Sequence, residues 1–240
     1  MNLAEYKGVY VFAQQVDNQI SSIALELIGK GKDLAKDLGT TVTAVLVGSN
    51  VKGLADELGE YGADKVIVVD DPELKDYRTE PYTHAITSVI NEFKPDIFLI
   101  GATAIGRDLG PRVCARIHTG LTADCTKLDI DEETKLLMMT RPAFGGNIMA
   151  TIVCEDFRPQ MATVRYKVMN APERTEETHG EIISCAIDKE KIKAHVDVLD
   201  IVKKEPEKFI ESADVLVVAG RGIKKEEDLA MTVSYTHLRA

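Results

Sequence analysis

Short apolar runs rich in β-branched residues alternate with helical patterns along roughly the first hundred residues of this chain. The runs are GVYVFA, TVTAVLVG, DKVIVVD and DIFLIGA, and the helical patterns between them cover residues 21–38, 51–61 and 82–93. Strands that are apolar almost throughout are typical of parallel sheets, because helices then cover both faces of the sheet. The alternation therefore predicts an α/β fold in which stacked βα units form a parallel sheet with flanking helices.

The helical pattern from Ser21 to Leu38 is amphipathic. Its apolar and glycine positions recur at steps of three and four residues, at Ile20, Ile23, Leu27, Gly31, Leu34 and Leu38. Charged residues, Glu26 among them, fall mainly on the other faces, as expected for a crossover helix that lies on a sheet. Gly39 follows the last leucine and suits a C-cap in the left-handed conformation.

From Ala123 onward, strand patterns follow one another without helices between them. They are ADCTKLDID, KLLMMTRPAF, GNIMATIVC, QMATVRY, EIISCAID and HVDVLDIV. Consecutive strands with short connections pair antiparallel, and Gly145 and Gly146 supply a permissive turn, so the sequence predicts an antiparallel β extension. The polar stretch 170–181 is predicted to be an exposed loop. Residues 1–200 are expected to form one N-terminal domain, after which PEKFIESADVLVVAGRG begins a second α/β pattern.

Composition narrows the classes of partner. The net charge of −10 argues against a nucleic-acid or anionic-lipid surface and favours a protein or small-molecule partner. No apolar run reaches the roughly 18 residues of a membrane span, and the N-terminus lacks the zones of a signal peptide. We therefore expect a cytoplasmic protein without a membrane span.

Catalytic and metal-binding patterns do not occur in the sequence. The serines lack a G-x-S-x-G elbow, and no carboxylate pair stands out for acid–base chemistry. His118 at a predicted helix end and His195 in a predicted strand are interpreted as structural. Buried thiols are favoured over a disulfide or a zinc site for the isolated cysteines, which are Cys114, Cys125, Cys154 and Cys185. The sequence thus predicts no substrate-transforming activity.

The stretch GATAIGRDLGPRVCARIHTG follows a predicted strand and invites comparison with phosphate-binding loops. A Walker loop fails, because Arg107 and Asp108 stand where lysine and a hydroxyl residue are needed. Gly110 and Gly120 have the spacing of universal-stress-type nucleotide sites, but Leu121 replaces the expected hydroxyl residue. We favour a tight strand-to-helix turn with Asp108 near the helix N-terminus and Pro111 in its first turn.

The stretch TRPAFGGN places Arg141 and Phe144 at a glycine hairpin. Arginine and aromatic residues are enriched at binding hot spots, so the pair is interpreted as a partner interface. A hairpin corner with Arg141 in a surface ion pair fits the spacing equally well.

The turn Gly220-Arg221-Gly222 follows a predicted strand, residues 215–219. Its glycines would let the backbone approach a ligand, and Arg221 could donate to a phosphate or flavin oxygen. The G-x-G-x-x-G spacing of dinucleotide sites is missing, so a surface turn with a solvated arginine is the alternative.

Taken together, several stretches closely resemble the α-subunit of electron transfer flavoproteins, particularly the forms of anaerobic bacteria. They are VYVFAQQ, KPDIFLIGATAIGRDLGPRVCARIHTGLTADCTKLDID, LLMMTRPAFGGNIMATIVCEDFRPQMATVR and ADVLVVAGRGIKK. The resemblance runs from about Met1 to Met231, and the blocks RDLGPRVCARIHTGLTADC and TRPAFGGN are specific to the family.

The resemblance implies an N-terminal domain of the adenine-nucleotide α-hydrolase-like type that does not hold AMP, which the family's β-subunit binds instead. It also implies a second, doubly wound domain that binds FAD, in which Arg221, between Gly220 and Gly222, matches an arginine that contacts the flavin. Other FAD-binding motifs of the family do not occur in this chain. Residues 201–231 are thus expected to be the incomplete start of that domain, and residues 232–240, TVSYTHLRA, a foreign tail.

The function implied by the resemblance is electron transfer rather than catalysis. FAD would carry electrons between acyl-CoA dehydrogenase-type partners and other redox proteins, in a heterodimer with a β-subunit and with flavin-based bifurcation as an option. The alternative is a stand-alone nucleotide-binding module of the universal-stress type.

Overall fold

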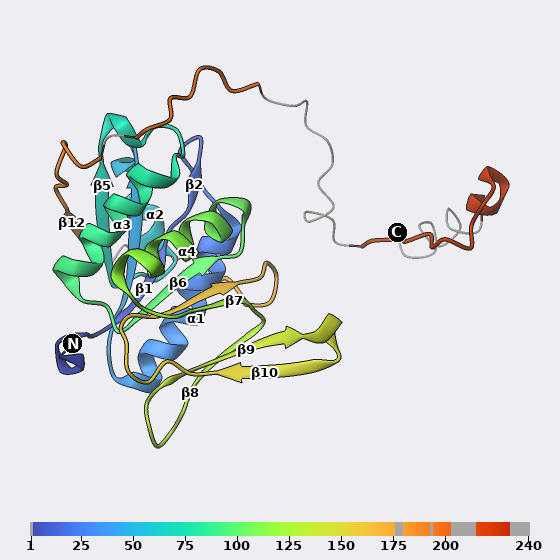
Figure 1. The fold of residues 1–240 in the computed structure, drawn as a ribbon, viewed down its shortest axis with the longest axis horizontal. Helices are drawn as coiled ribbons and strands as arrows, with labels where there is room; N and C mark the ends of the chain where they lie inside the picture. The colour runs from blue at the N-terminus through green and yellow to red at the C-terminus, as the bar shows by residue number, and fades with distance from the viewer. Residues whose placement is uncertain (1, 176–179, 193, 203–214, 231–240) are drawn as a thin grey trace. The chain divides into compact units, whose positions relative to one another are not determined.

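The computed structural model describes residues 2–175, 180–192, 194–202 and 215–230. The chain divides into two compact units, Met1–Asp197 and Val198–Ala240. The sheets and the helices α1 to α4 belong to the first unit (Figure 1), and a one-turn 3₁₀ helix, η6 (Glu226–Asp228), lies in the second.

A seven-stranded sheet forms the centre of the first unit. Its strands lie in the order β12 (Glu181–Ser184), β5 (Lys65–Asp70), β4 (Val42–Gly48), β1 (Val9–Phe12), β6 (Ile97–Gly101), β11 (Gln160–Val164) and β7 (Leu121–Cys125). All neighbouring strands pair in parallel. The predicted parallel sheet is thus confirmed, with the completely buried strands β1 and β4 at its middle.

Helices cover both faces of this sheet. They are α1 (Ser22–Leu38), α2 (Ala55–Glu60), α3 (Thr79–Phe93) and α4 (Ala104–Ile117). The side chains of α1 and α2 pack in one apolar cluster, and those of α3 and α4 pack in another on the opposite face. The predicted apolar face of α1 is confirmed by its buried residues, and Gly39 caps the helix in the left-handed conformation with φ 63°.

Short elements connect the larger ones. A two-stranded hairpin, β2 (Gln15–Val16) and β3 (Gln19–Ile20), follows β1. One-turn 3₁₀ helices occur at η1 (Leu3–Glu5), η2 (Lys52–Leu54) and η3 (Pro72–Leu74), whereas the short segment η4 (Phe144–Gly146) has positive φ angles and is a turn. The helix predicted over residues 51–61 is therefore divided into η2 and the short helix α2.

The antiparallel extension consists of three strands, β8 (Lys127–Ile130), β9 (Leu137–Ala143) and β10 (Ile148–Ile152). Gly145 and Gly146 form the predicted turn between β9 and β10, with φ 71° and 92°. Figure 1 shows this hairpin projecting beyond the parallel sheet.

Three of the strands expected in that extension belong to the parallel sheet instead: β7, β11 and β12. The prediction of antiparallel pairing for them was wrong, because a strand pattern does not say which neighbour the strand pairs with. Strand β11 is buried throughout between β6 and β7. No strand forms over residues 195–202, and the backbone N–H of His195 donates to Glu80 instead, 2.9 Å from Oε2.

The chain from β11 to β12 crosses α1 as a strap, residues 165–175. The strap has no regular secondary structure and is mostly exposed, as predicted for its second half. Glu26 holds it, because the backbone N–H of Lys167 donates to Glu26 Oε2 over 2.9 Å. Glu26 is only 7% exposed, so its expected place on an outer face of the helix was wrong.

In the second unit, residues 215–220 form no strand, and their valine side chains are exposed. The prediction of a strand over residues 215–219 is therefore wrong. A strand needs a neighbouring strand for its backbone hydrogen bonds, and the described residues of the second unit include none. The predicted turn is present, since the N–H of Ile223 donates to the carbonyl of Gly220 over 3.1 Å. The predicted tail, 232–240, lies outside the described residues.

Candidate functional site

The carboxyl ends of β1 and β6 are the place where a doubly wound sheet usually binds a ligand, because the strand order reverses there. Here, buried side chains meet at that position: Thr103 Oγ1 donates to Gln14 Oε1 over 2.6 Å. Thr103 also caps α4 by accepting from the Gly106 N–H over 2.8 Å. A Cβ on Gly106 would lie 1.8 Å from the Gly101 carbonyl oxygen, so the turn from strand to helix is closed tightly. This confirms the tight turn favoured from the sequence.

The expected positions of Asp108 and Pro111 in that turn were wrong. Helix α4 begins at Ala104, so Pro111 lies in the interior of the helix and not in its first turn. Asp108 accepts hydrogen bonds from the hydroxyls of Tyr77 and Thr79, each over 2.6 Å. Burial and the adjacent Asp108 carboxylate together raise the pKa of Tyr77. Asp108 thus connects two elements and is occupied by contacts within the chain.

The predicted interface residues lie on the hairpin of β9 and β10. Phe144 is at its tip and 82% exposed. Arg141 lies farther along β9, opposite Ala150, and its Nε is buried without a hydrogen-bond partner among the described residues. The structure gives Arg141 no ion pair among the residues described, so the surface ion pair considered from the sequence is not found there.

An acidic residue that the sequence did not single out, Asp124, lies at the end of β7 between two arginines. Arg107 approaches Asp124 Oδ1 to 3.1 Å, and Arg165 approaches Asp124 Oδ2 to 3.9 Å. The sequence offered only an indirect signal for this grouping, namely that each of the three residues stands near the end of a strand. Arg107 comes after β6, Arg165 comes after β11, and Asp124 is near the end of β7. Carboxyl ends of adjacent parallel strands meet at one edge of the sheet.

Arg141 lies in the same region as Asp124, because it is close enough to the neighbouring Cys125 for its charge to act on that thiol. Burial raises the pKa of the Cys125 thiol to about 12, and the positive charge of Arg141 acts on it in the opposite direction. The N–H of Thr126 donates to the Thr140 carbonyl over 2.9 Å, which joins the end of β7 to β9 next to Arg141. We call Arg107, Asp124, Arg141 and Arg165 the arginine cluster.

The remaining titratable candidates have structural surroundings. Cys125 and Cys185 are buried as expected, whereas Cys114 and Cys154 are only half-buried, and all four thiols are free. His118 ends α4 in the left-handed conformation, which agrees with its structural interpretation. Within the described ranges, no group of three or more His, Cys, Asp or Glu side chains is placed to hold a metal ion. The helices described there include none long and apolar enough to cross a membrane.

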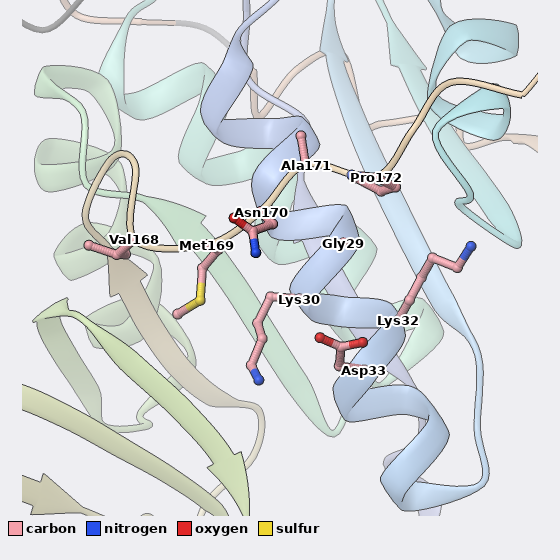
Figure 2. Close-up of a pocket in the computed structure, with 9 residues that line it drawn as sticks. All are labelled: Gly29, Lys30, Lys32, Asp33, Val168, Met169, Asn170, Ala171 and Pro172. Carbon is pink, nitrogen blue, oxygen red and sulfur yellow. The ribbon is translucent and has the colours of Figure 1, made fainter. Parts of the chain in front are cut away.

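A pocket of about 450 Å³ lies between α1 and the strap (Figure 2). Its lining consists of Gly29, Lys30, Lys32, Asp33 and residues 168–172. Figure 2 shows Lys30 and Lys32 pointing in different directions, with Asp33 between them. The two ammonium groups therefore do not converge on one ligand position.

In the second unit, the turn Gly220-Arg221-Gly222 borders a pocket of about 350 Å³. Ala219, Gly220, Ile223, Lys224, Lys225 and Leu229 line it. Arg221 is exposed, and a Cβ on Gly220 or Gly222 would meet no atom within 4 Å. Among the described residues, the two glycines of this turn thus have open space around them.

Comparison with known proteins identifies the family. Residues 9–190 match the family model described as "Electron transfer flavoprotein domain". The chain is 48% identical over 226 residues to the lactate dehydrogenase (NAD⁺, ferredoxin) subunit LctC of Acetobacterium woodii, covering 94% of this chain and 54% of LctC. It is 47% identical over 228 residues to the electron transfer flavoprotein subunit alpha of Megasphaera elsdenii, covering 95% of this chain and 68% of that subunit. For the subunit alpha of Clostridium acetobutylicum, the identity is 48% over 234 residues, and the shares are 95% and 69%.

The chain thus spans about half the length of LctC and about two thirds of the two alpha subunits. The matched region contains the parallel sheet, the antiparallel extension and the arginine cluster. With relatives this similar along nearly its whole length, the chain belongs to the electron transfer flavoprotein family, on the side of the alpha subunits.

Proposed function

We propose that the protein to which this chain belongs is an electron transfer flavoprotein α-subunit. Such a subunit passes electrons through FAD between dehydrogenases and other redox proteins. The observation that supports this most is the family match over residues 9–190 together with the named alpha-subunit relatives. The protein is an electron carrier rather than a substrate-transforming enzyme. The partners proposed are a β-subunit and an acyl-CoA dehydrogenase-type protein.

Flavin-based bifurcation is part of this proposal. The name of the LctC relative includes both NAD⁺ and ferredoxin, which are two different electron acceptors or donors. The present chain is 48% identical to LctC over 226 residues.

A stand-alone universal-stress-type nucleotide module is not favoured. The sheet position where such a module would hold an adenylate is occupied by the hydrogen-bonded pair Gln14 and Thr103. The close approach of Gly106 to the Gly101 carbonyl leaves no room for a side chain at the start of α4. The family match points the same way.

The described residues around Arg221 do not by themselves fit FAD. One open turn and a pocket of about 350 Å³ offer walls on few sides, whereas a buried cofactor needs an enclosing cleft with several convergent polar groups. The role of Gly220, Arg221 and Gly222 in holding the flavin therefore remains a proposal that rests on the family resemblance, and we derive no chemical step through FAD.

Flavin titration tests this proposal. We expect the 240-residue chain to bind FAD weakly or not at all, since it offers one charged contact in an open turn. In a full-length α-subunit that carries this turn, Arg221→Ala should weaken FAD binding roughly ten- to a hundredfold, because a hydrogen bond to a charged group is lost. Tight stoichiometric binding by the 240-residue chain, or unaltered binding after the substitution, would show that the flavin site lies elsewhere.

The hairpin of β9 and β10 is the proposed contact with the β-subunit. Phe144 at its tip presents a large apolar surface to solvent, and such aromatic residues act as interface anchors. Truncation by Phe144→Ala should weaken binding of the cognate β-subunit by about 2 kcal/mol or more in titration calorimetry. Val16→Ala, at an exposed apolar residue on the β2–β3 hairpin, is the matched control and should bind like the wild type. Equal affinities for both variants would remove Phe144 from the interface.

A further inference from the structure

The arginine cluster gathers positive charge at the carboxyl ends of β7 and β11. Asp124 has a left-handed backbone, with φ 60°, and its N–H donates to Thr163 Oγ1 over 3.0 Å. This unusual conformation places the Asp124 carboxylate between Arg107 and Arg165, at 3.1 and 3.9 Å. Two guanidinium groups thus flank one carboxylate, and Arg141 adds a third positive charge near the neighbouring Cys125, so the cluster is a local positive site in a chain whose net charge is −10.

Arg141 is the member of the cluster that lacks an anion. Its side chain has no hydrogen bond or ion pair within the described part of the chain, although its Nε is buried. A partly buried charge without a partner is costly, because neither water nor a counter-charge fully compensates its lost hydration. Asp124 accepts contacts from Arg107 and Arg165, and the structure records none from Arg141. An external carboxylate would satisfy Arg141.

Arg141 lies where the buried inner part of one hairpin face passes into an exposed apolar part. Residues directly opposite in an antiparallel pair lie on the same face of the sheet, and alternate residues of a strand do so too. By the pairing of β9 with β10, the face that carries Arg141 also carries Leu137 and Met139, which are buried in the core, and beyond them Ala143, Ile148, Ala150 and Ile152. Ile148 is 54% exposed and Ile152 40% exposed. Arginine amid exposed apolar side chains is the composition of a protein-binding hot spot.

We propose that the arginine cluster receives an aspartate or glutamate side chain of the β-subunit when that subunit covers the apolar face of β9 and β10. Arg141 donates to the incoming carboxylate, and the positive charges of Arg107 and Arg165 favour its approach. Charge complementarity selects an acidic partner segment, because the region holds the positive charges of Arg107, Arg165 and Arg141 against the single carboxylate of Asp124. This inference rests on the proposed function, which supplies the β-subunit as the occupant, and adds the chemistry by which the β-subunit is recognised.

Titration calorimetry of the cognate β-subunit at low and high salt tests the inference. Two variants perturb the cluster: Arg141→Ala, and the double variant Arg107→Glu with Arg165→Glu. Arg112→Glu is the matched control, because Arg112 is exposed on the same helix as Arg107 and has no ion pair among the residues described. We expect each cluster variant to bind at least about tenfold more weakly at low salt and to lose most of the salt dependence. Arg112→Glu should stay within about twofold of the wild type.

Each outcome bears on a different statement. If the wild-type chain does not bind the β-subunit, the proposed function fails and the inference fails with it. If the wild type binds but the cluster variants behave like Arg112→Glu, only the inference is overturned. Sedimentation of the chain alone tests whether a second copy of the chain occupies the site in place of the β-subunit. Self-association that the cluster variants abolish would assign the site to that second copy and overturn the inference. Should Arg141→Ala not fold by circular dichroism, the double variant decides, since both of its side chains are largely exposed.

Discussion

Glu26 is a buried acidic residue whose partner is the backbone of the strap. Burial raises the pKa of its carboxyl above the ordinary value of 4.5, while the N–H groups of Lys167 and Met169 act in the opposite direction. The raised pKa means that the folded protein binds this proton more tightly than the unfolded chain does. The contribution of the protonated side chain to stability is therefore complete at pH values below the ordinary pKa and is lost as pH rises through the folded value.

Replacement of Glu26 tests this sign. The difference in unfolding free energy between the wild type and Glu26→Gln should shift against the wild type as pH rises from about 4 to 7, because only the wild type must ionise a buried group. Urea unfolding at several pH values measures it. Asp37→Asn, at an exposed residue of the same helix, should show no such trend. A pH-independent difference for Glu26→Gln would mean that the strap contact is insensitive to the charge of the residue.

Helix α1 and the strap approach each other closely at Gly29. A Cβ at this position would lie 2.4 Å from the Asn170 carbonyl oxygen and 3.0 Å from Cδ of Pro172. An alanine within a helix normally stabilises it by about 0.5–1 kcal/mol relative to glycine. Here the backbone of the strap would have to shift, so the packing cost opposes that gain.

We therefore expect Gly29→Ala to destabilise the protein, by about 1–3 kcal/mol in urea unfolding. Gly53→Ala is the control, since a Cβ there meets no atom within 4 Å and the glycine has no positive φ. It should be neutral or slightly stabilising. Stabilisation by Gly29→Ala, as in an unobstructed helix, would show that the strap does not rest on α1 in solution.

At the scale of the whole molecule, the first unit has a complete core of two apolar clusters on the two faces of one sheet. Strand β12 pairs with β5 at the edge, and the strap is fixed to α2 by the Arg174–Glu60 ion pair at 2.5 Å. The chain from residue 195 to residue 202 is exposed instead, with Leu199 96% exposed. The folded core is thus expected to continue through β12 and to end after it.

Limited proteolysis with mass spectrometry tests this boundary. We predict a resistant fragment that begins near the N-terminus and ends between about residues 186 and 202, because cleavage needs exposed backbone that can open locally. An end within the strap, near Arg174, would show that β12 is not held by the sheet. Rapid digestion throughout would show that the first unit does not fold stably.

The sequence by itself determined the local elements of this protein. Apolar periodicity identified the strands and helices of the first hundred residues, and Gly39, Gly145 and Gly146 marked turns that the structure confirms. These features are local, because a backbone conformation and the burial of one helix face depend on neighbouring residues. The family resemblance is likewise confirmed, since it rests on stretches of contiguous residues.

Only the tertiary structure decided which strands pair and which side chains meet. The apolar runs of β7, β11 and β12 fit either kind of sheet, and their places were settled by neighbours distant in the sequence. The same holds for Glu26 beneath the strap and for Asp124 between Arg107 and Arg165. A charge pattern assigns such residues to solvent by default, but burial and pairing depend on the three-dimensional arrangement, because hydration is lost only where another part of the chain covers the group.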